Sequence, residues 1–128
     1  RSLGPRAVST DGTASWAELA GLLWRARLFV GVDTAAMHLA AACQCPTVAI
    51  FGPSVVGFWR PWRVAHEVVV AGPRPDFPAS HDEAEALKRR RTDEVPLEGV
   101  LAACDRMLAP ADAPRLSAAP AQPPVSSS

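Results

Sequence analysis

Apolar residues dominate three short runs of this chain, at positions 28–32, 47–51 and 66–70. Charged residues flank the first of these runs on both sides. A short apolar run without polar alternation is typical of a strand that is covered on both faces, as the strands of parallel sheets are. We therefore predict three strands at these positions, and we expect residues 6–9 to form the end of a further short strand.

Helical spacing of apolar residues appears before, between and after these runs. Ser15 and Glu18 fit a capping box, in which each residue satisfies a free backbone N–H of the other. The helix that begins there should end near residues 25–27, where cations lie close to its negative end. Residues 34–43 form an alanine-rich helix whose small side chains can pack closely on a sheet. Residues 95–108 carry an apolar stripe behind a proline at the first helical position.

The order of these elements predicts the fold class. Two strands joined by a helix form a right-handed crossover and therefore run parallel, and the short link between the helix at 34–43 and the strand at 47–51 is common in α/β units. We predict an α/β fold with a Rossmann-like parallel sheet flanked by helices. Residues 52–63 are expected to form a loop, and residues 71–92, which lack a clean period, to be mostly irregular.

The length of 128 residues allows one domain of ordinary size. Beyond Ala109 the sequence consists largely of Ala, Pro and Ser, which cannot bury enough apolar surface to become ordered. We predict one domain over residues 1–108, incomplete at its N-terminus, and a disordered tail over residues 109–128.

Charge and cysteine content exclude several classes of protein. The 13 basic residues balance the 13 acidic ones, so no net field favours nucleic acid or an acidic membrane. No apolar run approaches the ~20 residues that a membrane-spanning helix needs. Cys43, Cys45 and Cys104 lack the spacing of a zinc site, and we expect reduced thiols in a cytoplasmic protein. We expect no metal, no cofactor, no nucleic-acid partner and at most a peripheral association with a membrane.

Polar side chains gather where the first strand ends. Asp33 directly follows this strand, and Thr34 opens the next helix. Ligands of open α/β sheets bind beyond the carboxyl ends of the strands, and a helix N-terminus favours an anion. Asp33 could accept hydrogen bonds from sugar hydroxyls, while Thr34 could offer its hydroxyl and its N–H to a phosphate. In the alternative interpretation Asp33 and Thr34 merely cap the helix. The pattern of these two residues leaves both interpretations open.

Two further features add to this candidate site. His38 lies one helical turn after Thr34, on the same face, and could donate to a phosphate oxygen or serve as an ordinary structural histidine. Gly52, Pro53 and Ser54 follow the second strand, where Ser54 could reach a ligand, although a plain turn is an equal alternative. Together these groups favour a phosphate-bearing ligand, such as a nucleotide or nucleotide-sugar.

Other residues carry weaker signals. Trp59 and Trp62 flank Arg60 and Pro61 and could line a cleft, although ordinary packing is the favoured interpretation. His66 could anchor a loop or contact a ligand, and the anchor is the favoured interpretation. The sequence contains no Walker loop with its lysine and no G-x-G-x-x-G, which argues against an ATPase.

The run from Gly31 to Ala42, with Pro46 and the loop Phe51-Gly-Pro-Ser54, resembles the heptosyltransferases of glycosyltransferase family 9. The patterns Asp-Thr-(Gly or Ala)-x-x-His-Leu and (Phe or Tyr)-Gly-Pro-(Ser or Thr) are the most specific motifs of that family. The resemblance extends from about residue 13 to residue 108 and corresponds to the C-terminal half. Around residues 59–66 the chain is most similar to the heptosyltransferase III branch.

The resemblance implies a GT-B fold, in which two Rossmann-like domains face each other and the C-terminal one binds the nucleotide-sugar donor. It implies that Asp33 contacts heptose hydroxyls, that the amides of Thr34 and Ala35 hold the diphosphate, and that His38 supports it. The loop Gly52-Pro53-Ser54 would shape the neighbouring wall. The family inverts the anomeric carbon with an acidic base on the N-terminal domain and no metal, so no catalytic residue is expected in this chain.

Taken together, the resemblance implies transfer of heptose from ADP-heptose to the lipopolysaccharide inner core. This chain would be the donor-binding half, inactive without the N-terminal domain, in the cytoplasm or at the cytoplasmic face of the inner membrane. Two alternatives stay open: a GT-B transferase that uses another nucleotide-sugar, and a non-catalytic nucleotide-binding module or fragment.

Overall fold

The computed structural model describes residues 4–109. A parallel sheet is formed by β1 (Phe29–Val32), β2 (Thr47–Phe51) and β3 (His66–Val70), in the order β1-β2-β3. The three predicted strands are therefore confirmed, with the first beginning one residue later than expected. Their parallel pairing confirms the α/β fold class.

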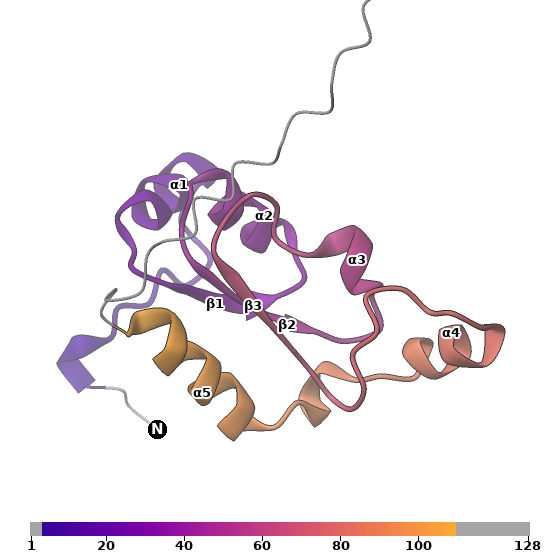
Figure 1. The fold of residues 1–128 in the computed structure, drawn as a ribbon. Coiled ribbons are helices and arrows are strands. Elements are labelled where there is room, and N and C mark those ends of the chain that lie inside the picture. Colours follow the sequence, from indigo (N-terminus) through magenta and orange to yellow (C-terminus); the bar gives the residue numbers. More distant parts are fainter. Residues whose placement is uncertain (1–3, 110–128) are drawn as a thin grey trace, which may run out of the picture.

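Three helices lie on one side of this sheet (Figure 1). They are α1 (Trp16–Arg25), α2 (Ala35–Ala42) and α3 (Val56–Trp59). Helix α2 packs on β1 and β2, and α1 packs on α2. Helix α3 falls within the segment expected to be a loop; it forms because Val56 reaches the core, where it is almost fully buried.

The core joins the sheet to these helices. Its main cluster contains one residue of α2, one of α3 and three of the sheet, namely Met37, Val56, Ala49, Phe51 and Val68. A second cluster, Leu23, Ala40 and Cys45, joins α1 to α2. Because α2 is held from both sides, the position of its N-terminus relative to the end of β1 is well determined.

The capping box predicted for α1 is confirmed. The N–H of Ser15 donates to Oε2 of Glu18 at 2.8 Å, and the N–H of Glu18 donates to Oγ of Ser15 at 3.2 Å. The hydrogen bonds from Ser15, the backbone one first, lower the pKa of the Glu18 carboxyl. The carboxylate form therefore stabilises the start of this helix.

One sequence prediction is wrong, and another is correct only in part. Residues 6–9 form no strand, and a 3₁₀ turn at Gly4–Arg6 precedes an irregular segment. The segment 71–92 contains the helix α4 (His81–Lys88).

Helix α4 begins because its first turn is capped. Oγ of Ser80 accepts from the N–H of Glu83 at 3.2 Å, and Oε2 of Glu83 accepts from the N–H of Ala79 at 2.6 Å. Leu87 is the one buried residue of this helix. Local capping is therefore enough to start this helix, although the segment has no apolar stripe. An argument from the spacing of apolar residues alone does not detect such a helix.

The opposite side of the sheet carries α5 (Leu97–Leu108), which packs on β2 and β3 (Figure 1). Pro96 is its N-cap rather than its first helical residue. A 3₁₀ turn, η2 (Thr92–Glu94), connects α4 to this helix. Arg106 of α5 binds Glu67 of β3 through two of its nitrogens, with the shortest contact at 2.6 Å, which fastens the helix to the sheet.

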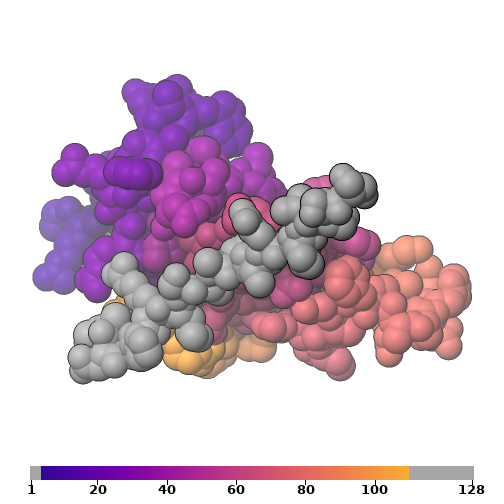
Figure 2. Space-filling view, turned by 45° about the horizontal axis from the view of Figure 1, so that its top comes forward, coloured from indigo at the N-terminus to yellow at the C-terminus, as the bar shows by residue number. Residues whose placement is uncertain are grey.

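The segments around α1 and around α4 lie at opposite ends of the molecule (Figure 2). Within residues 4–109 no helix combines the length and the apolar character that crossing a membrane requires. The predicted disordered tail lies outside the described residues except for Ala109.

Candidate functional site

The turn between β1 and α2 holds the main predicted site residues. Asp33 follows the last residue of β1, and its N–H donates to the carbonyl of Ile50 on β2 at 3.3 Å. This hydrogen bond continues the parallel ladder one residue beyond the strand. It places the Asp33 side chain at the carboxyl edge of the sheet, where ligands of open α/β sheets bind.

The N-terminus of α2 has no side-chain cap. Thr34 occupies the N-cap position in an extended conformation, but its hydroxyl donates to the carbonyl of Val32 at 3.3 Å and makes no cap hydrogen bond. Helices α1 and α4, in contrast, both have serine caps. Thr34 and Ala35 are exposed residues, and the first amides of a helix that lacks a side-chain cap can bind an anion.

The side chains of Asp33 and His38 lie close together at this helix end. Nε2 of His38 is 3.7 Å from Oδ1 of Asp33, while the Asp33 side chain is 17% exposed and that of His38 is 43% exposed. The separation is too long for a hydrogen bond but short enough for attraction when the imidazole is protonated. The pair offers a carboxylate to hydroxyl groups and an imidazole donor to an anion.

The loop Gly52-Pro53-Ser54 begins where β2 ends, beside the Asp33 turn. Gly52 is buried, Pro53 is exposed and Ser54 is partly buried. A Cβ at Gly52 would lie 2.6 Å from Oγ1 of Thr92, so the approach of η2 explains the glycine. Among the described hydrogen bonds, none joins Ser54 to Asp33, Thr34 or His38.

Trp59 contacts the site, although packing was its favoured interpretation from sequence. Its ring centroid is 6.3 Å from that of His38, with an interplanar angle of 59°. The indole remains 53% exposed. The tryptophan-rich segment after Gly52 indicated that an aromatic residue could line a site. The sequence did not show which residue Trp59 contacts, because His38 lies on another helix, α2. Trp62 is 75% exposed and lies in no described ring contact.

His66 is an anchor, as predicted. Its Nδ1 atom lies 2.8 Å from the carbonyl of Val64, just before β3. No group of three or more His, Cys, Asp or Glu side chains that could hold a metal occurs within residues 4–109. The three cysteines are free.

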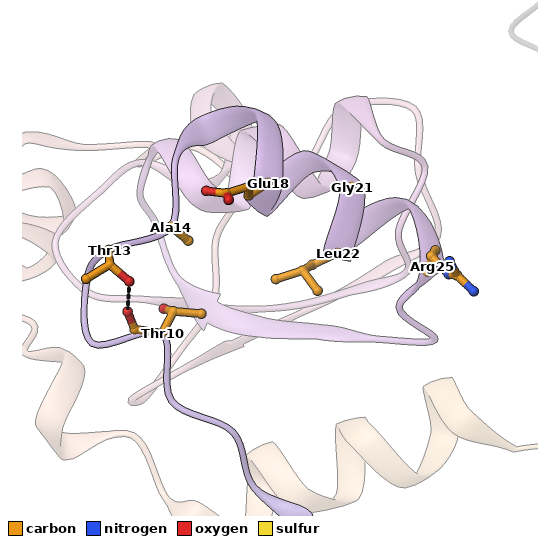
Figure 3. Close-up of a pocket in the computed structure, with 7 residues that line it drawn as sticks. All are labelled: Thr10, Thr13, Ala14, Glu18, Gly21, Leu22 and Arg25. Carbon is orange, nitrogen blue, oxygen red and sulfur yellow. Dashed lines mark hydrogen bonds between the residues drawn. The ribbon is translucent and has the colours of Figure 1, made fainter.

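A separate open pocket lies along α1 (Figure 3). Its lining residues are Thr10, Thr13, Ala14, Glu18, Gly21, Leu22 and Arg25. Thr13 donates to the carbonyl of Thr10 at 2.6 Å, and Glu18 is already engaged by Ser15. Because the side chains of Thr13 and Glu18 already have partners, we treat this pocket as a weaker candidate than the α2 N-terminus.

Comparison with known proteins gives consistent results. The sequence model of the family described as glycosyltransferase family 9 (heptosyltransferase) matches residues 7–88. Lipopolysaccharide heptosyltransferase 3 of Escherichia coli strain K12 is 37% identical over 105 residues, covering 80% of this chain and 29% of that protein. A second Escherichia coli protein of the same name is 33% identical over 104 residues, covering 81% of this chain and 30% of that protein.

A solved structure supports the fold. The glycosyl transferase family 9 protein from Veillonella parvula DSM 2008 superposes with a TM-score of 0.61 at 22% identity, covering 75% of this chain and 27% of that one. The chain thus spans less than a third of the length of its relatives. Because the family match covers more than half of this chain and includes the Asp33–His38 turn, the chain belongs to glycosyltransferase family 9.

Proposed function

We propose that the protein to which this chain belongs transfers heptose from ADP-heptose to the lipopolysaccharide inner core, and that this chain forms the donor-binding part. The observation that carries the proposal is the uncapped N-terminus of α2, with Asp33 and His38 close together beside it. The name of the two Escherichia coli relatives supports the reaction and the acceptor class.

The chemistry of this edge suits a sugar diphosphate. The amides of the exposed residues Thr34 and Ala35, together with the positive end of the helix dipole, favour the two phosphates. The imidazole of His38 can donate to a phosphate oxygen, and the Asp33 carboxylate can accept from sugar hydroxyls. Gly52, Pro53 and Ser54 would bound the ligand on the β2 side.

A second domain is part of the proposal. Within residues 4–109, β1 has a strand neighbour on one side only, and its Val30 and Val32 are 44% and 41% exposed. Parallel strands are normally covered on both faces, which supports the view that further parts of a GT-B protein cover this region. In this proposal the catalytic base lies on the N-terminal domain, and the enzyme works at the cytoplasmic face of the inner membrane.

Calorimetric titration of the chain with ADP, UDP and GDP tests the donor site. We expect ADP to bind best and its binding to disappear when Asp33, Thr34 and His38 are all replaced by alanine. His81→Gln is the matched control, because His81 is exposed on α4. A preference for UDP or GDP would favour a transferase that uses another nucleotide-sugar.

A transfer assay on the full-length protein tests the reaction. Asp33→Ala should abolish heptose transfer, whereas Asp105→Ala, on the exposed surface of α5, should leave it unchanged. Unchanged turnover in the Asp33 variant would disprove the site assignment. Nucleotide binding without any transfer by the full-length protein would favour a non-catalytic module.

A further inference from the structure

Helix α3, which carries Trp59, is held by contacts with Asp76 and Phe77. The N–H of Gly57 donates to the carbonyl of Asp76 at 2.8 Å. Nη2 of Arg60 lies 3.3 Å from Oδ2 of Asp76. Phe58 and Phe77 pack edge to face with their centroids 5.1 Å apart. The segment after β3 therefore clamps α3 and determines where the next side chain, Trp59, can lie.

The clamp is tight at Gly57. A Cβ at this position would overlap the ring of Phe77, so the aromatic ring occupies the space that a larger residue would need. With Val56 buried in the core, α3 is attached both to the sheet and to the Asp76–Phe77 segment. A short helix fixed at two places can present a side chain in a reproducible position.

His38, in contrast, has little else to orient it. The described contacts of its ring are the one with Trp59, at 6.3 Å between centroids, and the approach to Asp33, at 3.7 Å. No hydrogen bond to the imidazole is found within residues 4–109. A half-exposed side chain without such a bond samples several rotamers, and ordering it on ligand binding costs entropy.

We propose that Trp59 is a positioning residue of the donor site: its indole holds the imidazole of His38 beside Asp33, over the uncapped N-terminus of α2. The inference rests on the proposed function, since the ligand that His38 meets there is the donor diphosphate. Trp59 acts through His38, and the contact orders the imidazole before the ligand arrives.

Nuclear magnetic resonance of the histidine rings tests the positioning without any ligand. The chain has three histidines, so the His38 signals can be assigned with His38→Gln. Trp59→Ala should remove the ring-current shift of the His38 Hδ2 and Hε1 signals, and Trp59→Phe should retain part of it. The signals of His66 and His81 report whether each variant is still folded.

Trp62→Ala is the matched control, because Trp62 lies three positions further along and is more exposed than Trp59. It should leave the His38 signals unchanged. Unchanged His38 signals in Trp59→Ala, in a chain whose other histidine signals are intact, would overturn the positioning role. If Trp59→Ala loses all native signals, the variant is unfolded and Trp59→Phe serves as the test. Trp59→Phe keeps an aromatic contact and should change the shift of the His38 signals only in part.

Titration with ADP then tests whether the positioning matters for the ligand. We expect Trp59→Ala to weaken ADP binding about three- to tenfold, as the loss of one aromatic contact would, with Trp59→Phe near the unchanged chain. In the His38→Gln background the Trp59 substitution should have no further effect. An equal loss in both backgrounds would overturn the inference. Absence of ADP binding by the unchanged chain and by the full-length protein would instead overturn the proposed function, and the donor-site role of Trp59 with it.

Discussion

The hydroxyl of Thr34 donates to the carbonyl of Val32, 3.3 Å away, and not to the helix that it precedes. A threonine at an N-cap position usually accepts from an amide of the first turn. Here the hydroxyl turns back towards β1, and the first amides of α2 stay available. The Thr34 side chain therefore does not act as a cap, and its part in a binding site stays a prediction.

Thr34→Ala should therefore leave the stability of the fold almost unchanged. No cap hydrogen bond is lost, and we expect a change in the free energy of unfolding within about 0.5 kcal/mol. Ser15→Ala, which removes a real cap from α1, should cost about 1 kcal/mol. Urea denaturation of the two variants checks this contrast; an equal loss would show that Thr34 acts as a cap.

Gly52→Ala should destabilise the chain by about 1–3 kcal/mol, because a Cβ would lie 2.6 Å from Oγ1 of Thr92. Thr92→Ala removes that hydroxyl and should recover part of the loss. Urea denaturation of the two single variants and the double variant measures the coupling between the positions. If the two effects simply add, the close approach of η2 is not the reason for the glycine.

The ion pair between Glu67 and Arg106 should make stability depend on pH. The hydrogen bonds from Arg106 lower the pKa of the Glu67 carboxyl from its usual 4.5, and burial opposes this. A carboxyl with a lowered pKa contributes stability that is complete above the unfolded value of 4.5 and is lost as the pH falls through the folded value.

Denaturation at pH about 6 and about 3 checks this dependence. The unchanged chain should lose more stability over this range than Glu67→Gln does, because the amide does not titrate. Glu85→Gln is a suitable control, because the ion pair of Glu85 with Lys88 lies within α4 and does not connect this helix to another element. An identical loss in the unchanged chain and in Glu67→Gln would contradict the prediction.

Cys45 should be the least reactive thiol in the described part of the chain. It is 2% exposed, and burial, with a smaller contribution from the nearby Cys43 thiol, raises its pKa. Less thiolate and less access both slow alkylation. Mass spectrometry after iodoacetamide treatment should find Cys43 and Cys104 modified first and Cys45 only on unfolding. Early modification of Cys45 would mean that the α1–α2 cluster opens readily.

Local patterns were sufficient for the three strands of the sheet and for the helices α1, α2 and α5. β2 and β3 lie where the apolar runs indicated, and α1 begins at its capping box. Ser80 and Glu83 carry a capping signal for α4 as well, but the segment lacks the apolar stripe that usually marks a helix in a sequence. Short-range signals of this kind depend only on residues within one or two turns, so they can be read from sequence.

The order of apolar runs and helical segments is enough to assign the parallel α/β fold, and it places Asp33, Thr34 and His38 within six residues at the end of a strand. Only the tertiary structure decided which groups face them. The contact of Trp59 with His38 and that of Thr92 with Gly52 join residues far apart in the chain. Such contacts depend on how separate elements pack around the core, and a pattern read along one segment carries no information about that packing.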